Sequence, residues 1–408
     1  MKIKDIKARE ILDSRGNPTI EVDTILESGV IGRYSVPSGA STGSKEALEL
    51  RDNNKRYNRL GVIDVIDKIN TDLKFSVIGE NVFNQKKIDK ILIKKDGTKN
   101  KSKYGANAIL GISLSVLTAA SLEKKEPIYK YVGSKDIMPR IMVNIINGGK
   151  HADNNLEFQE FLLIPINKRI SEQIRMSSEV FHTLKKILKE KGYTVSVGDE
   201  GGFAPKLESN IEAIKIIIEA IKKAGYTPKK DFYLGLDVAA NEFFDGKKYI
   251  INGVSYKTNE LVTYYKRLIE NYPIISIEDP FYERDFKGFR ALTKETKIQI
   301  VGDDLYVTNK DYLKVGVREK LTNTILIKPN QIGTYTEMLQ TIDFAKKNKI
   351  RTIMSHRSGE TENTIIADLA VGLNLGQIKC GSMSRSDRTA KYNQLIRIEE
   401  EIKEKIKC

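Results

Sequence analysis

Residues 298–329 read IQIVGDDLYVTNKDYLKVGVREKLTNTILIKP, and this stretch decides the fold class. It opens and closes on short apolar runs, Ile298 to Val301 and Thr324 to Ile327, with an amphipathic segment between them. Short runs with almost no polar alternation are typical of strands buried on both faces, as in a parallel sheet covered by helices. The stretch therefore predicts one strand–helix–strand unit.

The same unit recurs from residue 140 onward. Apolar runs bounded by polar or glycine-containing turns occur at 141–146, 158–164, 194–197, 233–238, 274–277, 298–301, 324–327, 351–354 and 377–380. Helical patterns lie between them. One begins at the capping box Ser209-Asn-Ile-Glu212 and stops at Gly225. About eight such units in roughly 265 residues favour an α/β fold, a closed (β/α)8-type barrel, over an open sheet.

The first third of the chain has a different pattern. Residues 1–60 predict an antiparallel β ribbon that turns at Gly29, and 107–122 predict a buried helix. The pattern changes again near Gly133 to Pro139. We therefore expect a smaller α+β N-terminal domain over 1–134, which caps a catalytic barrel over 135–408. The small polar loop from Pro37 to Ser44 is typical of a flap.

Composition narrows the function classes. With 408 residues, 40% hydrophobic and 30% charged, the chain is globular. The net charge of +14 comes from 50 Lys and 18 Arg scattered along the chain, which favours a solvated surface over a nucleic-acid interface. Two cysteines, Cys380 and Cys408, make no disulfide scaffold. We find neither a secretory signal nor a run of about 18 apolar residues, so we expect a cytoplasmic protein.

Charged residues follow successive apolar runs at the same phase. Asp237, Glu278, Asp303 and Lys328 are separated by 41, 25 and 25 residues, which places them together at the carboxyl-end mouth of a barrel. Three converging carboxylates repel one another unless a cation neutralises them, and oxygen ligands without Cys or His favour Mg²⁺. Each acid could instead cap the helix that follows it. Three acids in register, followed by a lysine in register, favour the metal site.

Two further residues predict acid–base chemistry. Lys328 follows a buried strand, and Pro329 keeps its backbone extended. A partly buried lysine beside a metal site is expected to have a lowered pKa, which suits a general base. Glu200 lies in the glycine-rich turn 198–202, whose backbone freedom lets the carboxyl project into a cavity as a proton donor.

Ten segments in order resemble the enolase family, over nearly the whole chain. They are Asp13–Thr19, Pro37–Gly43, Asn147–His151, Phe158–Phe161, Gly198–Gly202, Ser276–Pro280, Val301–Asp304, Lys328–Gly333, Ser355–Thr361 and Ser384–Lys391. A lysine base paired with one or two Mg²⁺ is the known pattern of enolase-superfamily sites. The resemblance implies an atypical barrel whose first units depart from strict β/α alternation, in a homodimer or larger assembly.

The resemblance also implies an activity and a role for each matching residue. The activity is the reversible dehydration of 2-phospho-D-glycerate to phosphoenolpyruvate, in glycolysis and gluconeogenesis. Lys328 takes the C2 proton, and Glu200, assisted by Glu160, protonates the leaving C3 hydroxyl. The implied ligands of the first Mg²⁺ are Asp237, Glu278 and Asp303, and Ser41 helps to hold a second. The implied substrate contacts are Arg357 and Ser358 to the phosphate, Lys391 to the carboxylate, and His151, Gln159 and His356 in the pocket.

Two other functions compete with this one. The first is a superfamily relative that enolises a non-phosphorylated acid, against which Arg357, Ser358 and the long flap argue. The second is a non-catalytic protein that binds nucleic acid or surface partners, against which the intact Lys328 and Glu200 argue. The remaining histidine, His182, shares a helical face with lysines and is predicted to face solvent.

Overall fold

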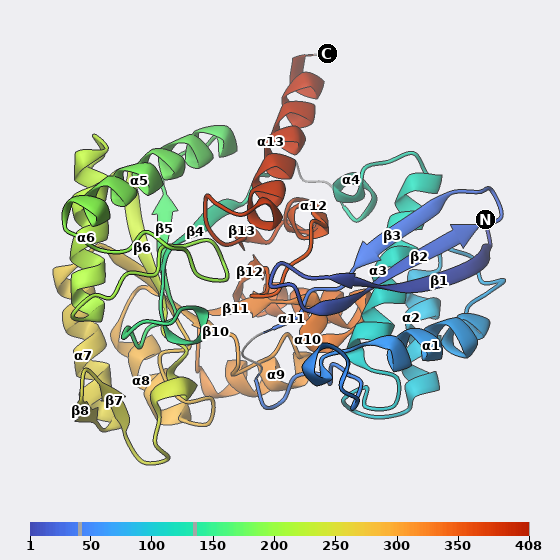
Figure 1. The fold of residues 1–408 in the computed structure, drawn as a ribbon, viewed down its shortest axis with the longest axis horizontal. Coiled ribbons are helices and arrows are strands. Elements are labelled where there is room, and N and C mark those ends of the chain that lie inside the picture. Colours follow the sequence, from blue (N-terminus) through green and yellow to red (C-terminus); the bar gives the residue numbers. More distant parts are fainter. Residues whose placement is uncertain (40–42, 134–136, 408) are drawn as a thin grey trace.

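The computed structural model describes residues 1–39, 43–133 and 137–407, and it places two bodies side by side (Figure 1). The N-terminal body carries a three-stranded antiparallel sheet in the order β1-β2-β3, with β1 at Ile3–Leu12, β2 at Pro18–Leu26 and β3 at Ile31–Ser35. Its α-helices are α1 (Ile63–Thr71), α2 (Gln85–Asp96), α3 (Ala106–Glu123) and α4 (Ile128–Tyr131). The predicted boundary at 134 and 135 falls in the short stretch 134–136, outside the described residues.

Helix α3 is the core helix of this body. By length and composition alone it could cross a membrane, but 83% of it is buried inside the protein, where it packs on β2 and β3. The packing is close because Gly32 has no side chain: a Cβ there would lie 2.1 Å from the backbone nitrogen of Ala119. The predicted buried helix over 107–122 is therefore confirmed, and its apolar character is explained by burial in the core.

The second body is a closed eight-stranded barrel in the order β10-β11-β12-β13-β4-β5-β6-β9, so the predicted fold class is confirmed. The barrel strands are β4 (Arg140–Asn147), β5 (Glu160–Pro165), β6 (Phe232–Asp237), β9 (Ile274–Glu278), β10 (Gln299–Gly302), β11 (Thr324–Ile327), β12 (Arg351–Ser355) and β13 (Gly376–Lys379). A small hairpin, β7 (Tyr249–Ile251) and β8 (Val254–Tyr256), follows β6.

Helices surround the barrel in Figure 1. They are α5 (Ile170–Glu190), α6 (Asn210–Lys223), α7 (Thr258–Asn271), α8 (Phe286–Glu295), α9 (Lys310–Glu319), α10 (Pro329–Ile332), α11 (Tyr335–Lys347), α12 (Ile365–Gly372) and α13 (Ser386–Lys407). The predicted cap of α6 is present, since the Ser209 hydroxyl accepts a hydrogen bond from the Glu212 amide at 3.2 Å.

The barrel departs from strict alternation at β5, which runs antiparallel to both β4 and β6. The chain passes from β4 to β5 without a long crossover helix, and such a short connection suits antiparallel strands. The run 194–197, expected as a strand, contributes no strand to the barrel and makes only an isolated bridge from Val197 to Phe203. Its residues are half-buried or exposed, so it lacks the two-sided burial that the other runs have.

The barrel interior is layered. Ser276, Gln299 and Gln377 form a hydrogen-bonded polar layer at the end where the parallel strands begin. Above it lies an apolar layer of buried side chains: Met142, Leu162, Ile164, Val301, Leu326 and Ile353. Because side chains alternate with a period of two, the inward residue two positions beyond Val301 is Asp303, and two beyond Leu326 is Lys328. The apolar layer therefore supports a charged layer at the mouth.

Candidate active site

Strand register brings three carboxylates together at the barrel mouth. Glu160 pairs with Asp237 across β5 and β6, and Asp237 pairs with Glu278 across β6 and β9. Glu160 is the first residue of its strand and the other two are the last of theirs, so the reversal of β5 is what turns Glu160 toward the same mouth. All three side chains are buried, with relative exposures of 1%, 4% and 2%.

A lysine that the sequence reasoning missed lies among these carboxylates. The Lys379 Nζ, at the end of β13, lies 3.0 Å from Asp237 Oδ2, 3.0 Å from Glu278 Oε2 and 3.3 Å from Glu160 Oε2. Burial alone would lower the pKa of Lys379, but Asp237, Glu160 and Glu278 raise it well above the ordinary value. Lys379 is therefore a fixed positive charge. The signal that could have revealed it is a lysine at an inward position of an otherwise buried strand.

Asp303 and Lys328 form the neighbouring pair. The Lys328 amine donates to Asp303 Oδ2, and the Gln331 amide donates to Asp303 Oδ1 at 2.9 Å. Burial lowers the pKa of Lys328, but the negative charge of Asp303 outweighs it, so the pKa is raised. The expected depression of this pKa is therefore wrong for the arrangement seen here. The cause is the direct ion pair with Asp303, to which the charge of Glu278 adds.

Glu200 lines the same small cavity as Lys328. Its carboxylate lies 3.5 Å from His151 Nδ1 and 3.4 Å from His356 Nε2, and it accepts a hydrogen bond from Asn144 Nδ2 at 2.9 Å. Burial lowers the pKa of His356 to about 4. The pKa of Glu200 is lowered, because the two histidines and Arg388 outweigh its burial.

Glu160 behaves in the opposite way. Burial and the charge of Glu200 raise the pKa of Glu160 well above its usual range. The pKa values of the two carboxyls are therefore displaced in opposite directions, and Glu160 is the one that favours its protonated form. This is the pair of acids with divergent pKa values that acid–base catalysis requires.

The segment 356–358 carries the implied phosphate contacts. Arg388 is fully buried in α13 and donates to three groups of this segment: His356 Nδ1, the Arg357 carbonyl at 2.6 Å and the Ser358 carbonyl at 2.6 Å. Arg388 thus fixes the segment's backbone against the barrel. Arg388 lies in the segment Ser384–Lys391 that resembles the family, but nothing in the sequence predicts this role.

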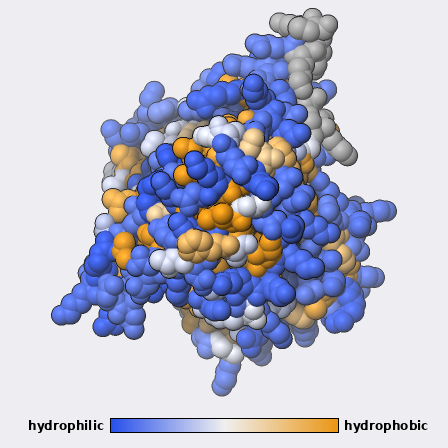
Figure 2. Space-filling model, turned by 90° about the vertical axis from the view of Figure 1, so that its right-hand side faces the viewer, coloured by the Kyte–Doolittle hydropathy of each residue, from blue (hydrophilic) through white to orange (hydrophobic). Residues whose placement is uncertain are grey.

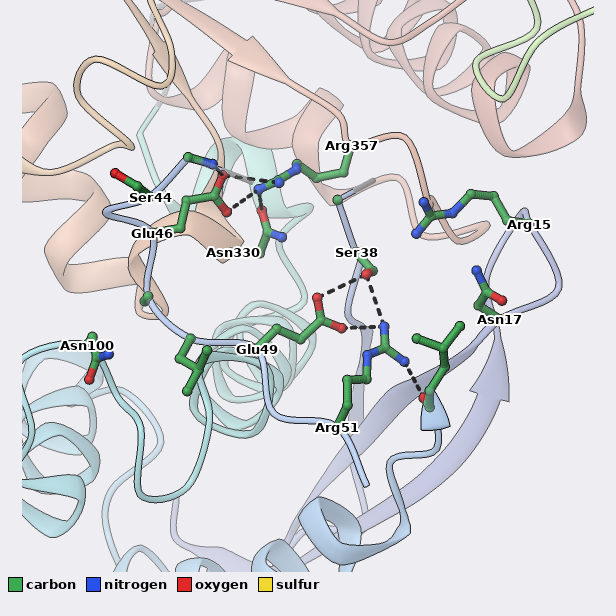
Figure 3. Close-up of a pocket in the computed structure, with 15 residues that line it drawn as sticks. Arg15, Asn17, Ser38, Ser44, Glu46, Glu49, Arg51, Asn100, Asn330 and Arg357 are labelled. Atoms are coloured by element: carbon green, nitrogen blue, oxygen red, sulfur yellow. Dashed lines mark hydrogen bonds and ion pairs between the residues drawn. The ribbon is translucent and has the colours of Figure 1, made fainter. Parts of the chain in front are cut away.

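Arg357 also lines a larger pocket of about 640 Å³ where the N-terminal body meets the barrel (Figure 3). Its guanidinium pairs with Glu46 and donates to Asn330 Oδ1 at 3.0 Å. Arg51 and Glu49 pair with one another elsewhere in this pocket. The pocket is therefore open and mostly charge-balanced, and Arg357 connects it to the mouth of the barrel.

Three further residues had a role or position predicted from the sequence: Lys391, Ser41 and His182. Lys391 does not reach the cavity, because its Nζ donates to the Thr361 carbonyl at 2.6 Å and pairs with Glu360 at 2.9 Å. Ser41, the implied ligand of a second Mg²⁺, lies outside the described residues. His182 is exposed, as predicted.

Most of the remaining expected residues surround one small cavity of about 20 Å³, which has room for about one water molecule, but Glu278 and Asp303 are not among the residues that line it. Its lining residues are His151, Gln159, Glu160, Glu200, Asp237, Lys328, Ser355, His356, Arg357, Ser358 and Lys379. Several buried polar atoms here lack a hydrogen-bond partner among the described residues, namely Gln159 Oε1, Glu160 Oε2, His151 Nδ1 and His356 Nε2. Such atoms are expected where a polar ligand binds.

The donor set fits a hard divalent cation. Two groups of side chains bring ligand atoms within 4.8 Å of one another: His151, Glu160 and Glu200, and Asp279, Asp303 and Asp304. The carboxylates of Asp237 and Glu278 both accept hydrogen bonds from the Lys379 ammonium. Their negative charges are therefore stabilised by a neighbouring positive charge. Clustered carboxylate oxygens are the ligands that Mg²⁺ prefers.

A buried lysine, a pair of acids with divergent pKa values and clustered carboxylates at the mouth of a barrel together define a class: metal-assisted acid–base enzymes. Family models give the particular family. The model described as "Enolase, N-terminal domain" matches residues 3–132, and that described as "Enolase, C-terminal TIM barrel domain" matches 135–408. The chain belongs to the enolase family, and the match supports a lyase of that family.

Proposed function

We propose that this protein catalyses the Mg²⁺-dependent, reversible dehydration of 2-phospho-D-glycerate to phosphoenolpyruvate. The observation that carries the proposal is the placement of Lys328 and of the Glu160–Glu200 pair around one buried cavity, with Arg357 and Ser358 on its wall. A base and an acid that flank a substrate are what loss of a C2 proton and a C3 hydroxide requires. An arginine on the wall supplies a partner for a phosphate.

Lys328 acts as the base that removes the C2 proton. The ion pair with Asp303 raises the pKa of Lys328, so a cation that offsets the charge of Asp303 would favour the neutral amine that accepts the proton. Divalent cations held by Asp237, Glu278 and Asp303, and by Ser41 for a second ion, would lower the energy of the dianionic enolate. The number of ions, two for each site, is part of the proposal.

Glu200 acts as the acid on the opposite side. Glu160 is the carboxyl that favours its protonated form, so it supplies a proton to Glu200, which passes it to the departing hydroxyl. His151 and His356 flank Glu200 and keep its carboxylate in place.

Lys379 replaces Lys391 in the proposed set of substrate contacts. Its permanent charge lies beside Asp237 and Glu278, where the substrate carboxylate would bind. A preorganised cation at this point favours the enolate, whose negative charge grows during proton removal. Lys391 instead has a structural role in its pair with Glu360.

We also propose a homo-oligomer, a dimer or larger, in the cytoplasm. On the face that the N-terminal body presents, hydrophobic residues gather within a hydrophilic surround (Figure 2). Exposed apolar patches of this kind mark association surfaces. The rest of the surface is rich in lysine, which suits contact with solvent. Binding of nucleic acid or of a surface partner would be a secondary role.

The test is an ultraviolet assay for phosphoenolpyruvate formed from 2-phosphoglycerate. We expect turnover with Mg²⁺, loss of turnover on addition of EDTA, and recovery when Mg²⁺ is restored. Non-phosphorylated 2-hydroxy acids serve as the comparison substrates. Strong turnover of one of them beside negligible turnover of 2-phosphoglycerate would show that this chain is a different member of the superfamily.

A further inference from the structure

Glu46 is a buried acid that the proposed reaction does not use. Its side chain is 8% exposed, and its Oε2 lies 2.9 Å from Nη1 of Arg357, whose side chain is 3% exposed. Glu46 Oε1 accepts from Arg357 Nη2 at 3.3 Å and from the Gly43 amide at 3.0 Å. In Figure 3 the Glu46 carboxylate and the Arg357 guanidinium point toward one another across the pocket.

The backbone beside Glu46 is anchored to the barrel. The Ala47 amide donates to the Gln331 carbonyl at 2.9 Å, and the Leu48 amide donates to the Asn100 carbonyl at 2.8 Å. Glu46 therefore presents its carboxylate from a segment with fixed neighbours on both bodies. It is a rigid partner for Arg357.

Gln331 links Glu46 to the predicted metal ligands. The Thr308 hydroxyl donates to Gln331 Oε1 at 2.7 Å, so the amide nitrogen points the other way. That nitrogen donates to Glu46 Oε1 at 3.3 Å and to Asp303 Oδ1 at 2.9 Å. The Gln331 amide thus hydrogen-bonds both Glu46, which pairs with Arg357, and Asp303, which pairs with Lys328.

This geometry matters because a guanidinium is planar and its direction decides what it binds. Two carboxylate oxygens on two guanidinium nitrogens fix the plane of Arg357, as a bidentate pair does. A buried guanidinium without its carboxylate is strongly disfavoured. Without Glu46, Arg357 would turn toward the other acids that act on it, Asp303 and Glu49.

We infer that Glu46 is a positioning residue, which holds Arg357 in the orientation that receives the substrate phosphate. The inference rests on the proposed function, since it takes Arg357 as the phosphate contact. Glu46 does not touch the reacting carbon atoms. It sets how well the phosphate is held, in substrate and transition state alike.

The test is Glu46→Gln, which keeps the shape of the side chain and removes its charge. We expect the KM for 2-phosphoglycerate and the inhibition constant of inorganic phosphate to rise together by about tenfold, the scale of one charge-assisted hydrogen bond. The kcat should stay within about threefold, because uniform binding is lost and Lys328 is untouched. Glu46→Asp, which restores the charge, should recover part of the phosphate affinity.

Glu49→Gln is the matched control. Glu49 lines the same pocket but pairs with Arg51 and accepts from the Ser38 hydroxyl, so its loss should leave phosphate inhibition within about twofold of wild type. An unchanged inhibition constant in Glu46→Gln would overturn the inference. So would tighter phosphate binding, since it would make Glu46 a competitor of phosphate. If Glu46→Gln does not fold, Glu46→Ala, which removes the carboxylate altogether, decides in its place, and wild-type phosphate affinity in that variant overturns the inference.

The wild-type protein separates the two proposals. If it does not convert 2-phosphoglycerate, the proposed function fails whatever Glu46 does. If wild type does convert 2-phosphoglycerate, and the Glu46 variants bind phosphate as wild type does, the positioning role fails and the proposed function stands.

Discussion

Two adjacent layers inside the barrel come from the same strands and have opposite chemistry. The inner layer is apolar and includes Val301 and Leu326. Two residues further along those strands, Asp303 and Lys328 lie at the mouth as a buried ion pair. The apolar layer gains free energy from burial, whereas the mouth buries charges at a cost.

The difference shows how the fold assembles the site. Close packing of the apolar layer fixes the strand positions, and the period of two then places every second residue at the mouth. The charged side chains converge because packing of the apolar layer fixes the strands that carry them. Attraction between the charges is not what brings them together. Substitutions in the two layers should therefore separate stability from activity.

The largest expected effect is at the mouth. Glu200→Gln removes the proposed proton donor, so dehydration should fall by about 10³, within the usual range for general acid–base groups. Exchange of the C2 proton with solvent should persist, because Lys328 is intact. Turnover by absorbance and exchange by proton NMR measure the two steps separately, and equal losses in both would assign Glu200 to more than the hydroxyl.

The next effect is in the apolar layer. Leu326 is fully buried, so Leu326→Ala should lower the free energy of unfolding by about 3 kcal/mol, through lost burial and a residual cavity. The kcat at 25 °C should change by less than about threefold, because the strands that carry the charged layer stay in place. Denaturant unfolding gives the first number. A kcat loss as large as that of Glu200→Gln would show that the two layers are not separable.

The smallest effect concerns a buried acid away from the mouth. Asp368 lies in α12, and burial raises its pKa to about 6 from its ordinary value of 3.8, against the hydrogen bond from Gln394. The folded state then binds more protons than the unfolded state between those values, so stability falls as pH rises through about 6.

Asp368→Asn should remove that loss. Relative to wild type we expect a gain of about 3 kcal/mol in the free energy of unfolding at pH 8, and little difference at pH 4. Urea unfolding at the two pH values measures it. A difference that does not depend on pH would mean that Asp368 is ionised at its ordinary pKa in the folded protein.

The sequence predicts the barrel well because its strands are buried on both faces and read as uninterrupted apolar runs. It predicts the phase of Asp237, Glu278, Asp303 and Lys328 for the same reason. The prediction of a strand at 194–197 is wrong because a run of four residues does not show whether a neighbouring strand is available to pair with it. The resemblance implies that the first units depart from strict β/α alternation, but neither it nor the residues predict that β5 is the strand that reverses.

The residues that were missed share one property. Lys379, Arg388 and Glu46 act through contacts with segments far away in the chain. The exchange of Lys391 for Lys379 illustrates this. Both are buried lysines in the carboxyl-terminal part of the chain, but Lys379 ends the barrel strand β13 and lines the cavity, whereas Lys391 lies in helix α13.

The central claim is that Lys328 removes the C2 proton of 2-phosphoglycerate, and proton NMR in deuterated buffer with Mg²⁺ tests it most directly. Wild type should exchange the C2 proton for deuterium, Lys328→Ala should slow that exchange by at least about 10², and Lys347→Ala, an exposed lysine, should match wild type. Exchange at the wild-type rate in Lys328→Ala would contradict the account.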